Sequence, residues 1–294
     1  MKCSAVRFFF ATSLSFLPVV SIAGCAASRD SSGGDRDSLG PPDAAAAGVP
    51  IDAFEDVEAA TPPAELQPYA APTAIPASAS CPSDMVEVVG SYCPDVRQSC
   101  LRWLDGPGPY EHFRCAAYGK PQCVSAERTP MRFCIDRLEA TSAGEALPMV
   151  HQSWTSAGNV CAAQGKRLCM ESEWQFACEG EEMRPYPYGF ERDASACNID
   201  RSNLGRPNAG LRDLRTPAGS HPRCASPFGV LDMSGNVEEW ATPDRPTDPR
   251  DRSTMKGAWW LPGRNTCRAA TTGHGETYEG SQVGVRCCSD PSRG

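Results

Sequence analysis

Cysteine is the residue type with the greatest chemical potential in this 294-residue chain, which contains 16 of them. Thiolates can carry out redox chemistry, and they bind metals such as Cu(I) and zinc. A zinc site needs clustered ligands, whereas the cysteine spacings here are irregular, no Cys-x-x-Cys pair occurs and only four histidines are present. Fourteen cysteines follow residue 80, which is an even number. In an exported domain, disulfide bonds are therefore their expected use.

The first 25 residues predict that the chain is exported. Lys2 and Arg7 make a basic start, residues 8–20 are an apolar run too short for a stable membrane span, and a small-residue segment precedes Cys25. This pattern is typical of a bacterial lipoprotein signal, although a plain signal peptide or a short membrane helix begins in a similar way. We predict a signal peptide over residues 1–25 and a lipid on Cys25. The lipid would anchor the protein to a membrane of the bacterial cell envelope, in the periplasm or at the cell surface.

Residues 26–80 differ in composition from the rest of the chain. They are rich in Ala, Pro, Gly, Ser and Asp and have almost no large apolar residues, so a disordered tether is expected. The tether carries a net charge of −7 and the signal peptide +2, which leaves only −3 of the total −8 for residues 81–294. No basic block is present, so a nucleic-acid partner is not expected. Residues 81–294 have the size of one domain.

Short periodic segments in residues 81–294 predict an α+β domain that is rich in loops. A helix is expected after the N-cap residue Ser153, ending near Gly165, and a second one over residues 171–178. Between residues 180 and 227 no periodicity holds and Pro and Gly recur, which predicts loops. The expected strands are short and occupy residues 85–89, 131–136, 229–232, 254–259, 267–270 and 283–288.

Six motifs occur in an order that can be compared with known families. They are Gly-Lys-Arg-Leu at 165–168, Glu-Trp at 173–174, Pro-Tyr-Gly at 187–189, Leu-Asp-Met-Ser-Gly-Asn-Val-Glu-Glu-Trp at 231–240, Lys-Gly-Ala-Trp at 256–259 and Val-Gly-Val-Arg-Cys at 283–287. The series resembles the formylglycine-generating enzyme, or sulfatase-modifying factor, family over residues 131–288. The resemblance implies an irregular, loop-rich, C-type-lectin-like fold with short strands, few helices and multiple disulfides. Residues 131–294 would form the family domain, with residues 81–130 as its Cys-rich N-terminal part.

The resemblance also implies two disulfide bonds. Cys161 and Cys178 correspond to family cysteines that bond to the last two strands, which suggests Cys161–Cys287 and Cys178–Cys267. The other ten cysteines of the domain cannot be paired from the sequence. Six of the fourteen lie between residues 81 and 134, where we expect a loop-rich, locally cross-linked region. Cys288 follows Cys287 directly, so the two would point to opposite faces of a strand.

A calcium site is implied by the motif at residues 232–239. In the family, the first and last side chains and two carbonyls between them bind the ion, which here would be Asp232, Glu239 and the carbonyls of Gly235 and Val237. Hard oxygen ligands of this kind suit Ca²⁺. The alternative is a capping loop in which Asp232 and Asn236 bond to the backbone.

A second calcium site is implied further upstream. The residues that resemble its ligands are Asn198, the carbonyl of Ile199, and Asp213. The carbonyl of Arg215 is the candidate for a fourth ligand. Calcium is therefore expected as a structural cofactor.

Catalysis in this family depends on a cysteine pair that is missing here. Active members carry two reactive cysteines shortly after the strand that corresponds to Lys256 onward, and their thiolates bind Cu(I) and activate O₂. Residues 257–266 contain no cysteine, so copper is not expected. Cys267 or a vicinal Cys287–Cys288 pair could substitute, but disulfides account for them better. Related sulfoxide synthases use a three-histidine iron site, whereas the histidines here are scattered. They are His112, His151, His221 and His274.

Three aromatic residues are candidates for ligand contact. In the implied fold, Trp259, Trp260 and Tyr278 border the groove that receives a peptide in active relatives. Trp259 is expected in the core and Trp260 on the surface, as an anchor for a ligand. The sequence thus predicts a membrane-anchored lipoprotein whose domain binds a peptide or protein without catalysis. The alternative is an active copper-dependent oxidase that generates formylglycine from a sulfatase cysteine.

Overall fold

The computed structural model describes residues 80–205, 210–246 and 252–292. The predicted signal peptide, the lipid site Cys25 and nearly all of the predicted tether lie outside these residues. Within the described ranges, every helix is too short or too polar to cross a membrane.

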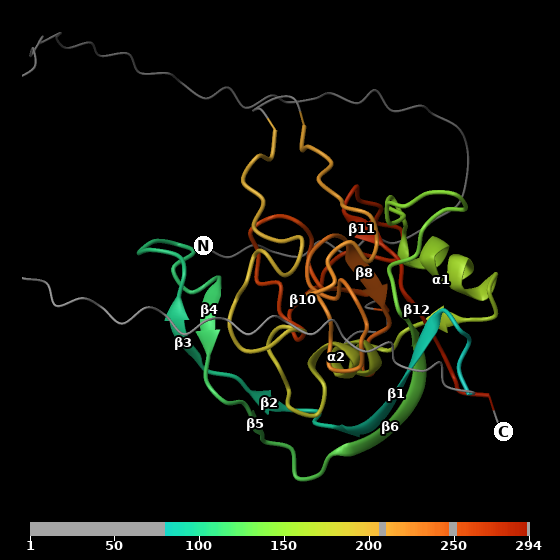
Figure 1. Cartoon of the computed structure of the whole chain (residues 1–294), viewed down its shortest axis with the longest axis horizontal. Helices are drawn as coiled ribbons and strands as arrows, with labels where there is room; N and C mark the ends of the chain where they lie inside the picture. Colours follow the sequence, from blue (N-terminus) through green and yellow to red (C-terminus); the bar gives the residue numbers. More distant parts are fainter. Residues whose placement is uncertain (1–79, 206–209, 247–251, 293–294) are drawn as a thin grey trace, which may run out of the picture. The chain divides into compact units, whose positions relative to one another are not determined.

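Two four-stranded sheets are present in the domain (Figure 1). In the first, the strand order is β1 (Met85–Tyr92), β6 (Thr129–Asp136), β12 (Cys287–Ser289) and β7 (Arg167–Leu168). In the second, it is β10 (Ala270–Thr271), β9 (Thr254–Lys256), β8 (Glu238–Ala241) and β11 (Val283–Gly284). Only the β8–β11 pair is parallel among these neighbours, and the chain passes through β9 and β10 before it pairs with β8 as β11.

The β1–β6 pair is the longest ladder among the described strands and follows the hydrophobic alternation of its sequence. Its register runs without a break from Met85 opposite Asp136 to Tyr92 opposite Thr129. Val86 and Val88 of β1 are buried, since every second side chain of a strand points to the same face. The strands expected at residues 85–89 and 131–136 are thus present and extend further than expected.

Two short ribbons continue from the β1–β6 ladder (Figure 1). One pairs β2 (Val96–Arg97) with β5 (Gln122–Cys123), and the other pairs β3 (Cys100–Trp103) with β4 (Cys115–Tyr118). A register shift interrupts the β3–β4 ribbon. This Cys-rich region was expected to be loops, and the short strands within it have no clear hydrophobic alternation.

The two described helices begin where capping residues allow. Helix α1 (Trp154–Ala162) follows the N-cap Ser153, whose hydroxyl accepts a hydrogen bond from the Ser156 amide at 3.1 Å. Helix α2 (Glu171–Glu179) begins with the Glu173 carboxylate accepting from the Met170 amide at 2.8 Å. These side chains satisfy amide groups that have no partner within the helix. Both helices were expected, although α1 ends before Gly165.

All fourteen cysteines from Cys81 onward form disulfide bonds, and two of the seven pairs are those that the resemblance implies, Cys161–Cys287 and Cys178–Cys267. The neighbours Cys287 and Cys288 point into different hydrophobic clusters, as the alternation of strand β12 requires. The other five pairs are Cys81–Cys134, Cys93–Cys123, Cys100–Cys115, Cys169–Cys288 and Cys197–Cys224.

Several expected strands differ from the structure. The strand expected over 254–259 ends at Lys256, because Gly257 and Ala258 have positive φ angles of 85° and 55°, which no strand accommodates. Residues 229–232 form only an isolated bridge at Leu231. The strand expected at 267–270 lies instead at 270–271, and the one at 283–288 is split into β11 and β12. Strand β8 was not expected, since it begins inside the motif taken as a calcium loop.

Taken together, the fold is the predicted one: a loop-rich α+β domain with short strands, few helices and multiple disulfides.

Candidate functional site

The loop that follows β9 carries the two tryptophans expected near a groove, but their roles are exchanged. Trp260 is only 1 % exposed, whereas Trp259 is partly exposed. The expectation rested on the family resemblance, in which the aromatic residue at position 259 belongs to the core. Because Ala258 adopts a positive φ, the chain turns after β9 and the second tryptophan enters the core. The Trp259 ring packs edge-on against the buried Trp260 ring, with the two centroids 4.9 Å apart.

A cavity of about 180 Å³ lies beside Trp259. Three of its lining residues, Glu238, Met255 and Thr271, come from neighbouring strands β8, β9 and β10. Met255 is the register partner of both Thr271 and Trp240, and Glu238 lies two residues before Trp240. Residues in these positions share one face of a sheet. We call this cavity the Trp259 groove.

Glu238 is the buried acidic residue among those that line the Trp259 groove. The Glu238 residue is 5 % exposed, and the Thr271 hydroxyl donates a hydrogen bond of 2.6 Å to its Oε1. Burial raises the pKa of this carboxyl, while the hydrogen bonds from Thr271 and Gln282 oppose the rise. Within the part of the chain that the structure describes, no basic side chain forms an ion pair with Glu238.

A buried arginine holds the outer wall of the groove in place. Arg192 donates hydrogen bonds to the carbonyls of Gly263 and Arg264, at 2.9 and 3.1 Å, and to the side chain of Asn265 at 2.8 Å. Its charge is balanced by Asp200, 2.7 Å away. The loop after Trp259 has no regular structure of its own, so these bonds determine its course.

The same aspartate connects the groove to the Cys-rich region. Arg114, beside Cys115 at the start of β4, pairs with Asp200 at 3.0 Å and with Asp105 across the hairpin loop. The adjacent Phe113 lines the groove, with the Arg264 guanidinium 5.8 Å from the centre of its ring. No local pattern in the sequence marks Arg114 and Asp200 as partners, because they are 86 positions apart.

Tyr278 does not line the groove. Its ring stacks on His274 with centroids 4.0 Å apart, and it packs against the cluster that contains Trp240 and Met255. Of the three aromatic residues predicted for ligand contact, only Trp259 lines the cavity.

The first predicted calcium set is only partly arranged for an ion. Both oxygens of Glu239 are engaged, since Arg286 pairs with Oε1 at 2.7 Å and the Trp174 indole donates to Oε2 at 2.6 Å. Asp232 accepts from the Gly219 amide at 2.6 Å, while its buried Oδ1 has no partner. An arginine on Glu239 disfavours a second cation there, so Glu239 does not fit the ligand role. The free Oδ1 of Asp232 does fit it.

The capping-loop alternative agrees with several of the same contacts. Asn236 accepts from the Thr216 amide at 2.9 Å and donates to Glu139 at 2.6 Å. Glu139 is fully buried close to Asp232 and Glu239, and burial together with these like charges raises its pKa well above the usual value. Burial also raises the pKa of Asp232, to about 6. The motif therefore encloses more negative charge than Arg286 can balance.

The second predicted calcium set is divided. Asn198 is buried, donates to the Leu214 carbonyl at 2.9 Å and accepts from Arg201 at 2.6 Å, and Ile199 is 1 % exposed. Asp213 is half exposed and pairs with Arg215 at 2.6 Å. The structure brings these two loops together, but the side chains of Asn198 and Asp213 bond to different partners. In the described ranges, no three His, Cys, Asp or Glu side chains are grouped to hold a metal ion.

The candidate cysteines are bonded to other cysteines, and the candidate histidines are not grouped as metal ligands within the described residues. Cys267, Cys287 and Cys288 are all in disulfide bonds. His112 lies beside Trp103 in the Cys-rich hairpin, and His274 stacks on Tyr278.

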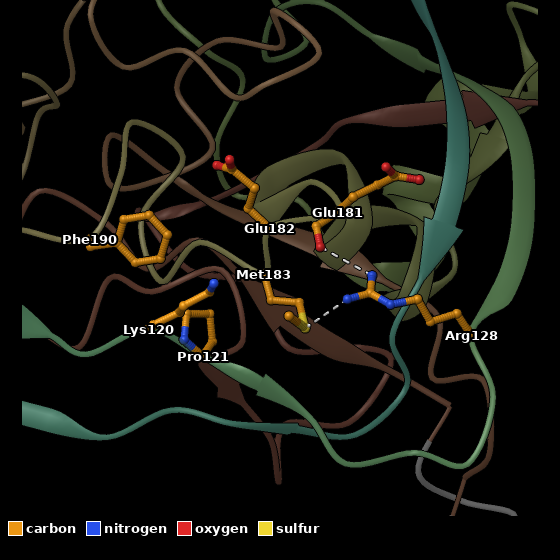
Figure 2. A pocket seen from close by; sticks show the side chains of 7 residues that line it. All are labelled: Lys120, Pro121, Arg128, Glu181, Glu182, Met183 and Phe190. Carbon is orange, nitrogen blue, oxygen red and sulfur yellow. Dashed lines mark hydrogen bonds between the residues drawn. The ribbon is translucent and has the colours of Figure 1, made fainter.

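A larger cavity of about 550 Å³ lies between the Cys-rich region and the end of α2 (Figure 2). Arg128 on one side donates to the Glu181 carbonyl at 3.1 Å and to the Met183 sulfur at 3.5 Å. Lys120 and Phe190 lie on the opposite side in Figure 2. Arg128 thus holds the backbone just after α2, so its contacts in this cavity wall are structural ones.

These features define a class: disulfide-rich, loop-rich α+β domains in which a short sheet carries a groove. The family model described as "Sulfatase-modifying factor enzyme 1-like domain" matches residues 113–291, and the chain belongs to that family. The match begins at Phe113, so most of the Cys-rich region precedes it.

Similar proteins include both inactive and active members by name. The chain is 32 % identical over 157 residues to "Inactive C-alpha-formylglycine-generating enzyme 2" of Mus musculus, covering 50 % of each chain. It is 28 % identical over 169 residues to the "Formylglycine-generating enzyme" of Thermomonospora curvata, covering 49 % of this chain and 56 % of that protein. The chain thus spans about half the length of the curated relatives it matches. The crystal structure of CarF aligns with a TM-score of 0.49 at 16 % identity, over 70 % of this chain and 98 % of that chain.

Proposed function

We propose that this protein is a membrane-anchored lipoprotein whose sulfatase-modifying-factor domain binds a peptide or protein and does not oxidise cysteine. The observation that supports the non-catalytic part is the use of every cysteine from Cys81 onward in a disulfide. A bonded cysteine has no thiolate, and thiolates are the ligands that select Cu(I). The similarity to a relative named as inactive agrees with this proposal.

The surface around the Trp259 groove supports a binding role. The β3–β4 hairpin, whose Phe113 lines the groove, exposes large apolar side chains, among them Leu101 at 71 % and Tyr110 at 67 %. Exposed apolar patches of this kind are typical of interaction surfaces. The Cys100–Cys115 bond cross-links the hairpin, so these side chains are presented on a rigid element.

The proposal also includes attachment of the protein to a membrane and a structural calcium ion in the domain. The signal-like pattern before Cys25 supports attachment to a membrane of the bacterial cell envelope, with the domain in the periplasm or at the cell surface. A structural calcium ion at Asp232 is proposed because its buried Oδ1 lacks a partner and the surrounding acids exceed the basic groups. An ion bound there would neutralise the excess negative charge.

The experiment starts with a free-thiol count on the exported, denatured protein. We expect no free thiol in residues 81–294. Random phage-displayed peptides are then selected on the full-length protein and tested against Trp259→Ala. Removing an interface tryptophan is expected to weaken binding about tenfold or more. Leu211→Ala, an exposed residue that does not line the groove, is the control and should leave binding unchanged.

Two results would contradict the proposal. The first is conversion of a sulfatase-derived cysteine peptide to formylglycine by the purified protein, together with two free thiols. That result would establish the oxidase alternative. The second is the failure of any selected peptide to depend on Trp259, which would remove the groove as the binding site.

A further inference from the structure

We propose that the Trp259 groove recognises a basic side chain of its ligand, lysine or arginine, and that Glu238 binds its charge. The inference rests on the proposed function, because it names the chemistry of the ligand that the groove would take. It concerns Glu238, Trp259 and Arg264, which all line the groove. None of them is a predicted calcium ligand or a disulfide cysteine, although Glu238 lies within the motif at residues 232–239.

Glu238 differs from the other buried acids of the sheet and helices. Glu239 pairs with Arg286 at 2.7 Å, and Glu179 pairs with Arg268 at 2.6 Å. Asp136 likewise has an internal cation, Lys166. Glu238 accepts hydrogen bonds from neutral side chains only, within the described part of the chain.

An unpaired buried carboxylate is costly unless another group balances its charge. A cation that enters the groove from outside would balance the charge of the Glu238 carboxylate and complete the site. Because Glu238 lines the cavity, an entering group can reach it, whereas Glu239 faces the opposite side of the strand.

The walls of the groove suit the rest of a basic side chain. Met255, Leu261 and Pro262 line the cavity and would contact an aliphatic stem, as the methylene groups of lysine and arginine commonly bury against apolar surface. Trp259 adds an aromatic face that attracts a cation. The volume of about 180 Å³ is small for a drug-sized ligand but suits one side chain.

Arg264 at the edge of the groove opposes the proposed cation. Its side chain is exposed and lies over the ring of Phe113, so its charge is partly screened by solvent. Removing this charge should therefore strengthen the binding of a basic ligand.

The test uses N-terminally acetylated pentapeptides in which the central residue of an alanine peptide is varied. Lysine and arginine supply the cation, norleucine and acetyl-lysine are its neutral counterparts, and an unacetylated alanine peptide tests a free N-terminus. Binding to the full-length protein is followed by tryptophan fluorescence and by NMR of the indole signals. A charge-assisted contact predicts that the lysine or arginine peptide binds about tenfold or more tightly than the neutral peptides.

Three variants connect this preference to the site. Glu238→Gln keeps an acceptor for Thr271 and should reduce the preference for the basic peptide to about twofold or less. Glu127→Gln, an exposed acid away from the groove, should leave it unchanged. Arg264→Ala should increase affinity for the basic peptide. The acetyl-lysine peptide tests the charge on the ligand side, so the result does not depend on the folding of Glu238→Gln.

Equal binding of the norleucine and lysine peptides would overturn the inference. So would a preference for the unacetylated peptide, or a preference that survives Glu238→Gln. In those cases peptides selected by phage display that still require Trp259 would leave the proposed function intact. If no selected peptide requires Trp259, the proposed function fails as well, so the two failures can be distinguished.

Discussion

The Cys-rich region before β6 and the part of the chain from β6 onward are held together in different ways. We call the second part the family domain, although the family match already begins at Phe113. The first contains disulfides that join residues 15 and 30 positions apart, and it exposes Leu101, Trp103 and Tyr110. The second contains disulfides spanning 126, 119 and 89 positions, and it buries Trp174, Trp240 and Trp260 completely or almost so. Local covalent links allow a segment to keep its shape without a large core. The Cys-rich region can therefore keep large apolar side chains exposed, whereas the family domain buries its own large apolar side chains.

Charges divide the two regions in the same way. In the family domain Arg286 is fully buried against Glu239, and Lys256 is fully buried near Glu171. Glu87 of the Cys-rich region instead meets Arg132 of β6 at the surface, with the arginine side chain 58 % exposed. Exposed pairs contribute little to stability, whereas breaking a buried pair leaves a charge without a partner. The family domain is thus the region where single charge changes should matter.

The largest expected effect comes from the two adjacent bridges Cys161–Cys287 and Cys169–Cys288. Replacing all four cysteines by alanine should lower the free energy of unfolding by about 5 kcal/mol or more, because two closed loops are opened. One lies between the two replaced bridges, and the other, of roughly 30 residues, lies between Cys169–Cys288 and the remaining bridge Cys178–Cys267. Replacing one pair should cost only about 2–3 kcal/mol, since the other bridge leaves a loop of about nine residues. Guanidinium unfolding followed by tryptophan fluorescence measures both values. The prediction would be contradicted if replacing one cysteine pair lowered the free energy of unfolding as much as replacing both pairs.

The hairpin bridge Cys100–Cys115 should have a smaller and more local effect. It closes a loop of 15 positions, so its loss costs at most about 3 kcal/mol. Replacing both cysteines by serine should accelerate proteolysis within residues 101–114 while the melting transition of the family domain shifts little. Limited proteolysis with mass spectrometry, alongside thermal unfolding, separates the two regions. A collapse of the whole domain would show that the regions are not held independently.

The smallest expected effect concerns Asp232 in calcium-free buffer. Its folded pKa of about 6 lies above its ordinary value of 3.8, so the folded state binds more protons than the unfolded state between these values. Stability due to this group is therefore present at low pH and is lost as pH rises through about 6. Asp232→Asn removes the ionisation and should raise the free energy of unfolding at neutral pH by about 1–3 kcal/mol.

Calcium provides the control for this substitution. Asparagine tolerates the positive φ of 60° at position 232, so the backbone should not be strained. If the proposed calcium ion binds at Asp232, added calcium raises the melting temperature of the natural protein and has less effect on Asp232→Asn. Thermal unfolding in EDTA and in excess calcium makes this comparison. A calcium response that is equal in both proteins would place the ion elsewhere.

The sequence predicted the helices and strands that depend on interactions between residues close together in the chain. Ser153 begins α1 because its hydroxyl caps the amide three residues later, and the alternation of Val86 and Val88 marks β1. The groove was predicted less well. Trp260 was expected outside and lies inside, because a turn at Ala258 interrupts the alternation. Glu238 was overlooked because, of the two glutamates in the recognised motif, the resemblance assigned a role only to Glu239.

The sequence by itself determined the family, the fold class and the even number of cysteines in the domain, since motifs, hydrophobic periodicity and composition are properties of short segments. The resemblance also implied two of the bridges. Only the tertiary structure decided the other five pairs, the engagement of Glu239 by Arg286 and the position of Glu238 among the residues that line the groove. Each of these depends on which distant segments pack together. Arg192 illustrates the reason, since its contacts to Asp200 and to Gly263 join two loops whose sequences contain no periodic signal.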